Sequence, residues 1–177
     1  MSDREPFAYY LDPAGTRTLC ERILCGAGLP ASQSAIVVDN LIRGDLRGIS
    51  SHGISRMTVY SERIASGGLN LDGEIAMVSD APAAMRMDAR NNMGAVAGTK
   101  AMEMVIDRAR TCGIAAGTVF NGNHFGFAAY YSLMAVQEDM IGISLSNAPA
   151  TRPPMRPLPW QAVSCRSECT RVRVLRS

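Results

Sequence analysis

Residues 113–148, GIAAGTVFNGNHFGFAAYYSLMAVQEDMIGISLSNA, decide the class of fold. Residues 114–121 predict a short strand, 126–139 predict a helix, and 141–148 predict a second short strand. A strand, a helix and a strand in this order are typical of α/β architecture. We therefore expect an α/β unit in this part of the chain.

Two loops of this unit are the first places to look for a functional site. In α/β sheets, functional groups gather where the carboxyl ends of strands meet loops. Asn121–Gly126 and Ser146–Pro149 both follow the end of a predicted strand.

The residues before this unit predict helices and one pair of strands. Asp12 is a plausible N-cap with Pro13 at the first helical position, Ser32 or Ser34 caps the next helix, and Ser51 caps a third. The expected helices cover about 12–26, 32–46, 51–67 and 94–111. Two short strands are expected on either side of Ala81-Pro82.

The charge of the chain changes abruptly near Thr151. Residues 1–151 carry a net charge of −3, whereas 152–177 contain six arginines and a single acid and carry +5. The body of the chain therefore gives no reason to expect a nucleic-acid partner. A basic interaction arm is one interpretation of the tail, and a shift of the reading frame is another. The abrupt change in composition favours the frame shift.

Composition indicates a globular protein, with 47% hydrophobic and 19% charged residues. No apolar segment approaches the roughly 18 residues of a membrane helix, and the N-terminus lacks the pattern of a signal peptide. We therefore expect no membrane association and a cytoplasmic location. The five cysteines are odd in number and lack CxxC spacing, which indicates reduced thiols and no zinc site.

The segment RGISSHGISRMTVY, residues 47–60, contains one of the two histidines. If a helix begins at Ser51, then His52, Arg56 and Tyr60 follow one another at i, i+4 and i+8 on one face. An arginine fork fits the two oxygens of a carboxylate, and the positive end of the helix dipole favours an anion there. A purely structural histidine with surface contacts is an equally good interpretation of this spacing.

The second histidine, His124, lies in NGNHFGFAAYY, between the end of a predicted strand and a helix. Loops held by a rigid scaffold carry functional side chains more often than packed elements do. A histidine with a pKa near ~6.5 can accept and return a proton at neutral pH. His124 is therefore the candidate acid/base group, and a histidine that only bonds its own loop is the alternative.

Other catalytic motifs are absent from the sequence. No GxSxG elbow and no phosphate-binding P-loop occur, and the GAG at 26–28 lacks the third glycine of a Rossmann fingerprint. Two histidines without a carboxylate cluster make a poor metal site, so we expect no metal.

Two segments in the same order, DLRGISSHGISRMTVYSERIASGG and GNHFGFAAYYSLMAVQEDMIGISLSNA, resemble the malate/L-lactate dehydrogenase family of NAD(P)-dependent oxidoreductases. Ureidoglycolate and sulfolactate dehydrogenases belong to the same family, which is distinct from the Rossmann-type enzymes. The resemblance runs from about Tyr10 to Ala150. It implies a non-Rossmann α/β nicotinamide-binding architecture, commonly in a homodimer.

The resemblance also implies an activity and its residues. Family members transfer a hydride between NAD or NADP and a small 2-hydroxy or 2-oxo acid. His124 matches the acid/base histidine of the family. Ser51, His52, Arg56 and Tyr60 match substrate-binding positions, with Arg56 the best candidate for the carboxylate. The segment along the cofactor is matched by Ser146, Asn147 and Ala148.

The chain departs from the family pattern after this segment. We expect an N-terminal helical segment at 1–72, a partial cofactor-binding domain at 73–151 and an unrelated basic tail at 152–177. The fold would then be incomplete at its C-terminus. A truncated, non-catalytic remnant of such an enzyme is the alternative to an active dehydrogenase.

Overall fold

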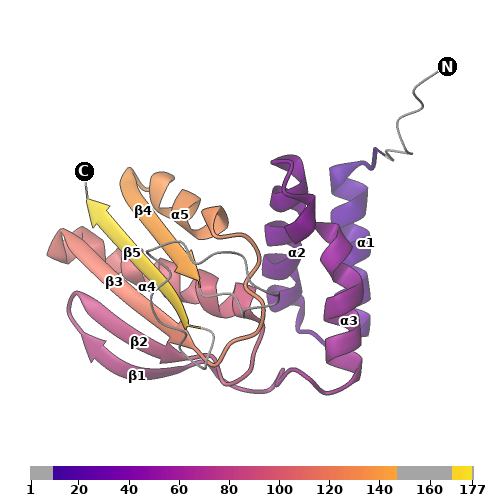
Figure 1. Ribbon diagram of the computed structural model, residues 1–177, viewed down its shortest axis with the longest axis horizontal. Helices are drawn as coiled ribbons and strands as arrows, with labels where there is room; N and C mark the ends of the chain where they lie inside the picture. Colours follow the sequence, from indigo (N-terminus) through magenta and orange to yellow (C-terminus); the bar gives the residue numbers. More distant parts are fainter. Residues whose placement is uncertain (1–9, 147–168, 177) are drawn as a thin grey trace, which may run out of the picture.

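The computed structural model describes residues 10–146 in full and residues 169–176 for their backbone alone. Three helices lie at one end of the molecule and a sheet with two more helices at the other (Figure 1). The chain is thus a mixed α/β protein, as the pattern at 113–148 predicted. The elements are α1 (Pro13–Gly26), α2 (Ala31–Leu46), the 3-10 turns η1 (Ser50–His52) and η2 (Ile54–Arg56), α3 (Met57–Ala65), β1 (Ala76–Ala81), β2 (Ala84–Asp88), α4 (Gly94–Cys112), β3 (Ile114–Phe120), α5 (Ala129–Val136), β4 (Met140–Ser146) and β5 (Cys169–Arg176).

The first helix begins as its cap residues predicted. The Asp12 carboxylate accepts a hydrogen bond from the Gly15 N–H at 2.6 Å, and Pro13 occupies the first helical position. The carboxylate thereby pairs one of the free N–H groups of the first turn, which stabilises the helix start.

The predicted serine cap of the second helix is wrong. The N-cap of α2 is Pro30, whose side chain makes no capping hydrogen bond, so neither Ser32 nor Ser34 is the cap. Ser34 is buried within the first turn of α2, and its hydroxyl donates to the Glu21 carbonyl of α1 at 3.1 Å. Ser34 therefore joins α2 to α1 and does not cap α2.

The third predicted helix is also wrong at its start, because α3 begins at Met57 and not at Ser51. Gly53 separates η1 from η2 in an extended conformation, with φ −94° and ψ −157°. A Cβ at Gly53 would lie 1.8 Å from Asp45 Oδ1, and Asp45 Oδ2 accepts the Ile54 N–H at 2.7 Å. A carboxylate from the end of α2 therefore interrupts the helix.

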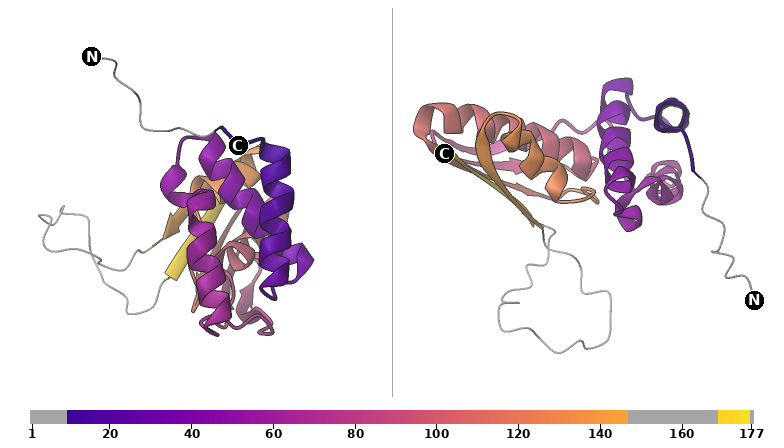
Figure 2. Two further views of the ribbon diagram at one scale, coloured as in Figure 1. Left: turned by 90° about the vertical axis from the view of Figure 1, so that its right-hand side faces the viewer. Right: turned by 90° about the horizontal axis from the view of Figure 1, so that it is seen from above.

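The sheet has the strand order β1-β2-β3-β5-β4. β1 and β2 form the predicted hairpin, β2 and β3 are parallel, and β5 lies antiparallel between β3 and β4. β3 and β4 therefore run in the same direction and end at one edge, with Phe120 opposite Cys169 and Ser146 opposite Thr170. Figure 2 shows α4 and α5 together over one face of this sheet.

Two apolar cores join the two ends of the molecule. The first packs α4 and α5 on the sheet around the fully buried Tyr131, Met87 and Met102. The second packs α1, α2 and α3 around Leu24, and it includes residues at the start of α4 such as Met93. Because α4 contributes to both cores, it fixes the helices beside the sheet.

The sequence pattern did not predict β5, which forms within the basic tail. Residues 152–168, together with Asn147 and Ala148, lie outside the described residues. The frame-shift interpretation and the boundaries 1–72, 73–151 and 152–177 therefore stay predictions.

Candidate active site

His124 lies in the loop that leaves the carboxyl end of β3, between β3 and α5. This loop packs directly on the start of α4. A Cβ at Gly94 would lie 1.9 Å from the Asn123 carbonyl oxygen, so only glycine permits the observed approach. The first turn of α4 therefore fixes the position of the loop that carries His124.

A second loop, which follows β2, is joined to the His124 loop by hydrogen bonds between asparagines. Asn91 and Asn121 both have positive φ, at 64° and 55°, which asparagine tolerates better than most residues. The Asn91 N–H donates to the Asn121 carbonyl at 2.7 Å, and Asn123 Nδ2 donates to Asn91 Oδ1 at 2.7 Å. From α3, Arg63 donates to Asn123 Oδ1 at 2.8 Å. The backbone next to His124 is thus held from two sides.

Gly126 closes the loop in a left-handed conformation, with φ 82°. A Cβ there would lie 1.9 Å from Asn40 Oδ1, a buried side chain of α2. Asn40 Nδ2 lies 3.4 Å from the Phe125 carbonyl in the same loop. Glycine is therefore required both by the backbone and by the close packing of α2.

The segment with the first histidine is held by its own residues and by Asp45 of α2. Ser51 Oγ lies 2.9 Å from His52 Nδ1, and Arg56 Nε donates to the Ser51 carbonyl at 2.7 Å. The Arg56 side chain is half-buried, and its terminal nitrogens have no hydrogen-bond partner in the part of the chain that the structure describes.

Three of the predicted site residues come together across the fold. The rings of His52 and His124 stack with centroids 5.4 Å apart, and the Tyr60 hydroxyl lies 2.7 Å from His124 Nδ1. The predicted single helical stripe is wrong, since Gly53 interrupts it. The side chains of η1 and α3 meet instead through His124, which the sequence placed in a separate motif.

The environment keeps His124 neutral. Burial is the main cause that lowers its pKa, from 6.5 to about 4, and the charges of Arg56, His52 and Arg63 act in the same direction. Burial raises the pKa of Tyr60 to about 12, although Arg56 and Arg63 oppose the shift. Burial, and then Arg56, also lower the pKa of His52. The site thus combines neutral hydrogen-bonding groups with fixed positive charges.

Ser146 is the described part of the predicted cofactor segment. It is exposed at the end of β4, on the sheet edge where β3 also ends. Ser146 and the His124 loop thus both lie at the carboxyl ends of strands, as the sequence predicted. Asn147 and Ala148 lie beyond the described residues.

Arg63 is a site residue that the sequence did not indicate. It is three residues after Tyr60 in α3, and residues at this spacing share a helix face. Its contact with Asn123 and its effect on the pKa of His124 place it at the site. The spacing from Tyr60 was the signal that could have found it.

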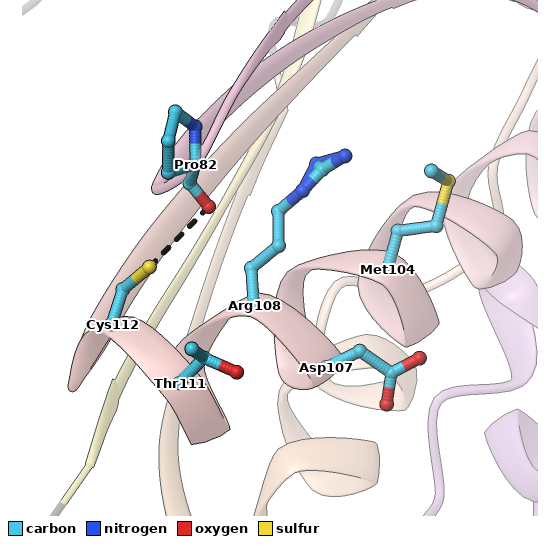
Figure 3. A pocket seen from close by; sticks show the side chains of 6 residues that line it. All are labelled: Pro82, Met104, Asp107, Arg108, Thr111 and Cys112. Atoms are coloured by element: carbon cyan, nitrogen blue, oxygen red, sulfur yellow. Dashed lines mark hydrogen bonds between the residues drawn. The ribbon is translucent and has the colours of Figure 1, made fainter.

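A separate pocket of about 410 Å³ lies on α4 (Figure 3). It is lined by α4 residues and by Pro82 of the β1–β2 turn, whose carbonyl accepts a hydrogen bond from the Cys112 thiol at 3.5 Å. None of the predicted site residues lines it. Among the described residues there is no cluster of three metal-ligand side chains and no helix long and apolar enough to cross a membrane.

Comparison with known proteins identifies relatives of this chain in sequence and in fold. The family model described as Malate/L-lactate dehydrogenase matches residues 11–159. The malate dehydrogenase of Pyrococcus abyssi is 46% identical over 127 residues, which are 72% of this chain and 35% of that enzyme. The L-sulfolactate dehydrogenase of Methanocaldococcus jannaschii is 37% identical over 147 residues, which are 83% of this chain and 42% of that one.

A solved structure agrees with the sequence comparisons. Malate dehydrogenase from Pyrococcus horikoshii OT3 matches with a TM-score of 0.76 and 36% identity, over 80% of this chain and 42% of that one. The chain thus spans about two fifths of the length of these relatives. Other relatives are named as dehydrogenases that use NAD(+) or NADP(+). The chain belongs to the malate/L-lactate dehydrogenase family of NAD(P)-dependent 2-hydroxyacid dehydrogenases.

Proposed function

We propose that the chain carries the acid-binding and proton-exchanging side of an NAD(P)-dependent 2-hydroxyacid dehydrogenase site. The observation that supports this most is the meeting of His52, Tyr60 and His124 at hydrogen-bonding and stacking distance. The positive charges of Arg56 and Arg63 act on this cluster. A cationic, partly buried site of this kind attracts small organic anions.

Arg56 is the residue proposed to bind the substrate carboxylate. Its Nε is already bonded to the Ser51 carbonyl, which orients the guanidinium and leaves its terminal nitrogens for a ligand. A planar fork of two N–H donors matches the two oxygens of a carboxylate. Ser51 and His52 stand on the same turn and would bind the remaining polar groups of the acid.

His124 is proposed to exchange the proton of the reacting oxygen. Nδ1 is occupied by Tyr60, so Nε2 is the nitrogen left to contact the substrate. In the reduction, a 2-oxo acid gains a hydride at its carbonyl carbon. A His124 ring protonated at both nitrogens, a form that an anionic substrate beside Arg56 would favour, gives its Nε2 proton to the oxygen and becomes neutral. The bond from Nε2 to hydrogen breaks as the new O–H bond forms.

The nicotinamide, when bound, would supply or accept the hydride. Ser146, with Asn147 and Ala148 after it, is proposed to lie along this cofactor. The exposed position of Ser146, at the end of the sheet where the His124 loop also begins, supports that assignment. NAD or NADP as the cofactor and a homodimer are proposed from the family resemblance, and a cytoplasmic location is proposed from the composition of the chain.

The test is an assay of the purified chain with NADH or NADPH and a panel of small 2-oxo acids. We expect oxidation of the reduced cofactor, and we expect His124→Gln to abolish it. Arg47→Gln, which changes an exposed arginine outside the site, is the matched control and should retain activity. Absence of cofactor binding at every concentration would instead support the alternative, a non-catalytic remnant of such an enzyme.

A further inference from the structure

His124 Nδ1 has two neighbours that constrain where the ring carries its proton. The Gly126 N–H points at Nδ1 from 3.3 Å, and the Tyr60 hydroxyl lies 2.7 Å from the same atom. A backbone N–H can only donate, so Nδ1 must be the acceptor in this contact. The neutral ring then carries its proton on Nε2.

The position of Tyr60 suits it to bonding His124 Nδ1. Its side chain is 3% exposed in the second core, and its hydroxyl reaches His124 across 64 residues of sequence. The ring of Tyr60 also lies 6.0 Å from the His124 ring, tilted by 50°. A buried tyrosine whose hydroxyl is already bonded has limited capacity to bind a substrate as well. Substrate binding is the role that the family resemblance implies for Tyr60.

We infer that Tyr60 is the positioning residue of His124, and that its hydroxyl, together with the Gly126 N–H, reserves Nδ1 and directs a protonated Nε2 toward the substrate. This rests on the proposed function for its catalytic meaning, but the ring tautomer is a property of the free protein. The tautomer can therefore be measured whether or not the chain turns over a substrate.

A hydroxyl suits this role better than a second N–H group would. It donates to Nδ1 when the ring is neutral, and it accepts from Nδ1 when that nitrogen is protonated. When a fully protonated ring gives its Nε2 proton to the substrate oxygen, the Nδ1–H remains bonded to Tyr60. The ring thus keeps its orientation through both protonation states.

The charges around the ring agree with this assignment. The groups that face His124 are His52 from η1, Arg56 from η2, and Tyr60 and Arg63 from α3. The cations disfavour a second proton on the ring, so the free protein holds His124 as a neutral donor. An anionic substrate beside Arg56 would offset these charges and raise the proton affinity of the ring.

The test uses the presence of only two histidines in the chain. Protein labelled with ¹⁵N in histidine alone gives two ring systems, and His52→Gln assigns them. At neutral pH we expect the His124 ring as the Nε2–H tautomer. In Tyr60→Phe we expect a changed Nδ1 chemical shift and a changed His124 titration, while the Gly126 N–H still favours the Nε2–H tautomer. Tyr130→Phe is the matched control, because its hydroxyl bonds Asp39 instead, and it should leave the His124 signals unchanged.

Each outcome decides the matter. An Nδ1–H tautomer in the unmodified chain, or a Tyr60→Phe ring identical to the original, would overturn the inference. Should Tyr60→Phe fail to fold, replacing all tyrosines by 3-fluorotyrosine makes the hydroxyl a stronger donor without changing its shape. The Nδ1 signal of His124 should then shift while that of His52 does not, and equal shifts would count against Tyr60.

If the chain is active, Tyr60→Phe should lower kcat about tenfold, as loss of one charged-state hydrogen bond implies, with little change in KM. A substrate-binding role for Tyr60 would raise KM instead. Absence of activity in the unmodified chain would count against the proposed function but would not affect the tautomer result.

Discussion

The segment 50–57 and the loop 121–126 each present one histidine to the same site, but they are held in different ways. In the first, most bonds are local, since Ser51 contacts His52 and Arg56 bonds the Ser51 carbonyl, and Asp45 of α2 accepts the Ile54 N–H. In the second, the contacts come from α2, α3, α4 and the loop after β2. Distant elements therefore hold the second segment at more points than the first, which they hold through Asp45 of α2.

This difference suits the two segments to different functions, proton transfer and binding of the acid. Proton transfer requires accurate placement of the donor, and a rigid supporting shell supplies it. Binding of a small acid tolerates adjustment, so a short segment with local bonds suffices. Substitutions in the two regions should therefore fail in different ways.

The largest difference is expected between the two histidines. His124→Gln removes the group that exchanges the proton, and kcat should fall by about 10²- to 10⁴-fold. His52→Gln keeps a polar side chain in the binding segment, and its main effect should be an increase in KM of about tenfold. Steady-state kinetics with one 2-oxo acid checks both. Equal losses of kcat in the two variants would remove the distinction.

The next largest effect concerns the carboxylate. Arg56→Gln should raise KM by about ten- to a hundredfold, because it removes a charged two-pronged contact. Arg47→Gln makes the same change of charge nine residues earlier at an exposed position and should stay near the original KM. If the two variants respond alike, general electrostatic attraction explains the binding and a direct contact does not.

Glycine substitutions compare the packing of the two regions. Gly126→Ala forces a side chain into a left-handed backbone and against Asn40, and should lower the free energy of unfolding by about 2 kcal/mol or more. Gly53→Ala displaces only the Asp45 carboxylate from an allowed backbone and should cost less. Gly26→Ala, with nothing near its Cβ, is the control. Urea titrations measure all three, and a larger cost at Gly53 would reverse the comparison.

The last effect is a dependence of stability on pH. The pKa of His124 is about 4 in the folded chain and near ~6.5 when unfolded, so the unfolded chain binds more protons between these values. Stability from the neutral ring is complete above pH ~6.5 and is lost as the pH falls toward 4. His124→Gln should flatten this part of the profile of unfolding free energy. An unchanged slope in the variant would contradict the buried environment of His124.

Features fixed by nearby residues could be predicted from the sequence. Asp12 with Pro13 placed the start of α1, and the strand-helix-strand pattern placed β3, α5 and β4. His124 was predicted at the end of a strand, where it lies. These features depend on backbone propensity and hydrophobic period, which short segments carry.

Features that depend on contacts between distant segments could not be predicted. The break at Gly53 requires Asp45 from α2, the contact of Tyr60 requires a partner 64 residues away, and Ser34 gave up its cap for packing on α1. β5 pairs between strands that precede it by more than twenty residues. The helical spacing of His52, Arg56 and Tyr60 gave the wrong geometry for these residues, because Gly53 divides the segment.

The most direct test of the convergence of the two segments is a pH titration of the two histidine ring C–H signals by proton NMR. One signal, absent from His124→Gln, should titrate near pH 4, and the other, absent from His52→Gln, should titrate below its ordinary pKa of 6.5. Tyr60→Phe should change the first curve more than the second. A His124 signal that titrates at 6.5 or above would show a solvated histidine far from Arg56 and Arg63, and would contradict the site described above.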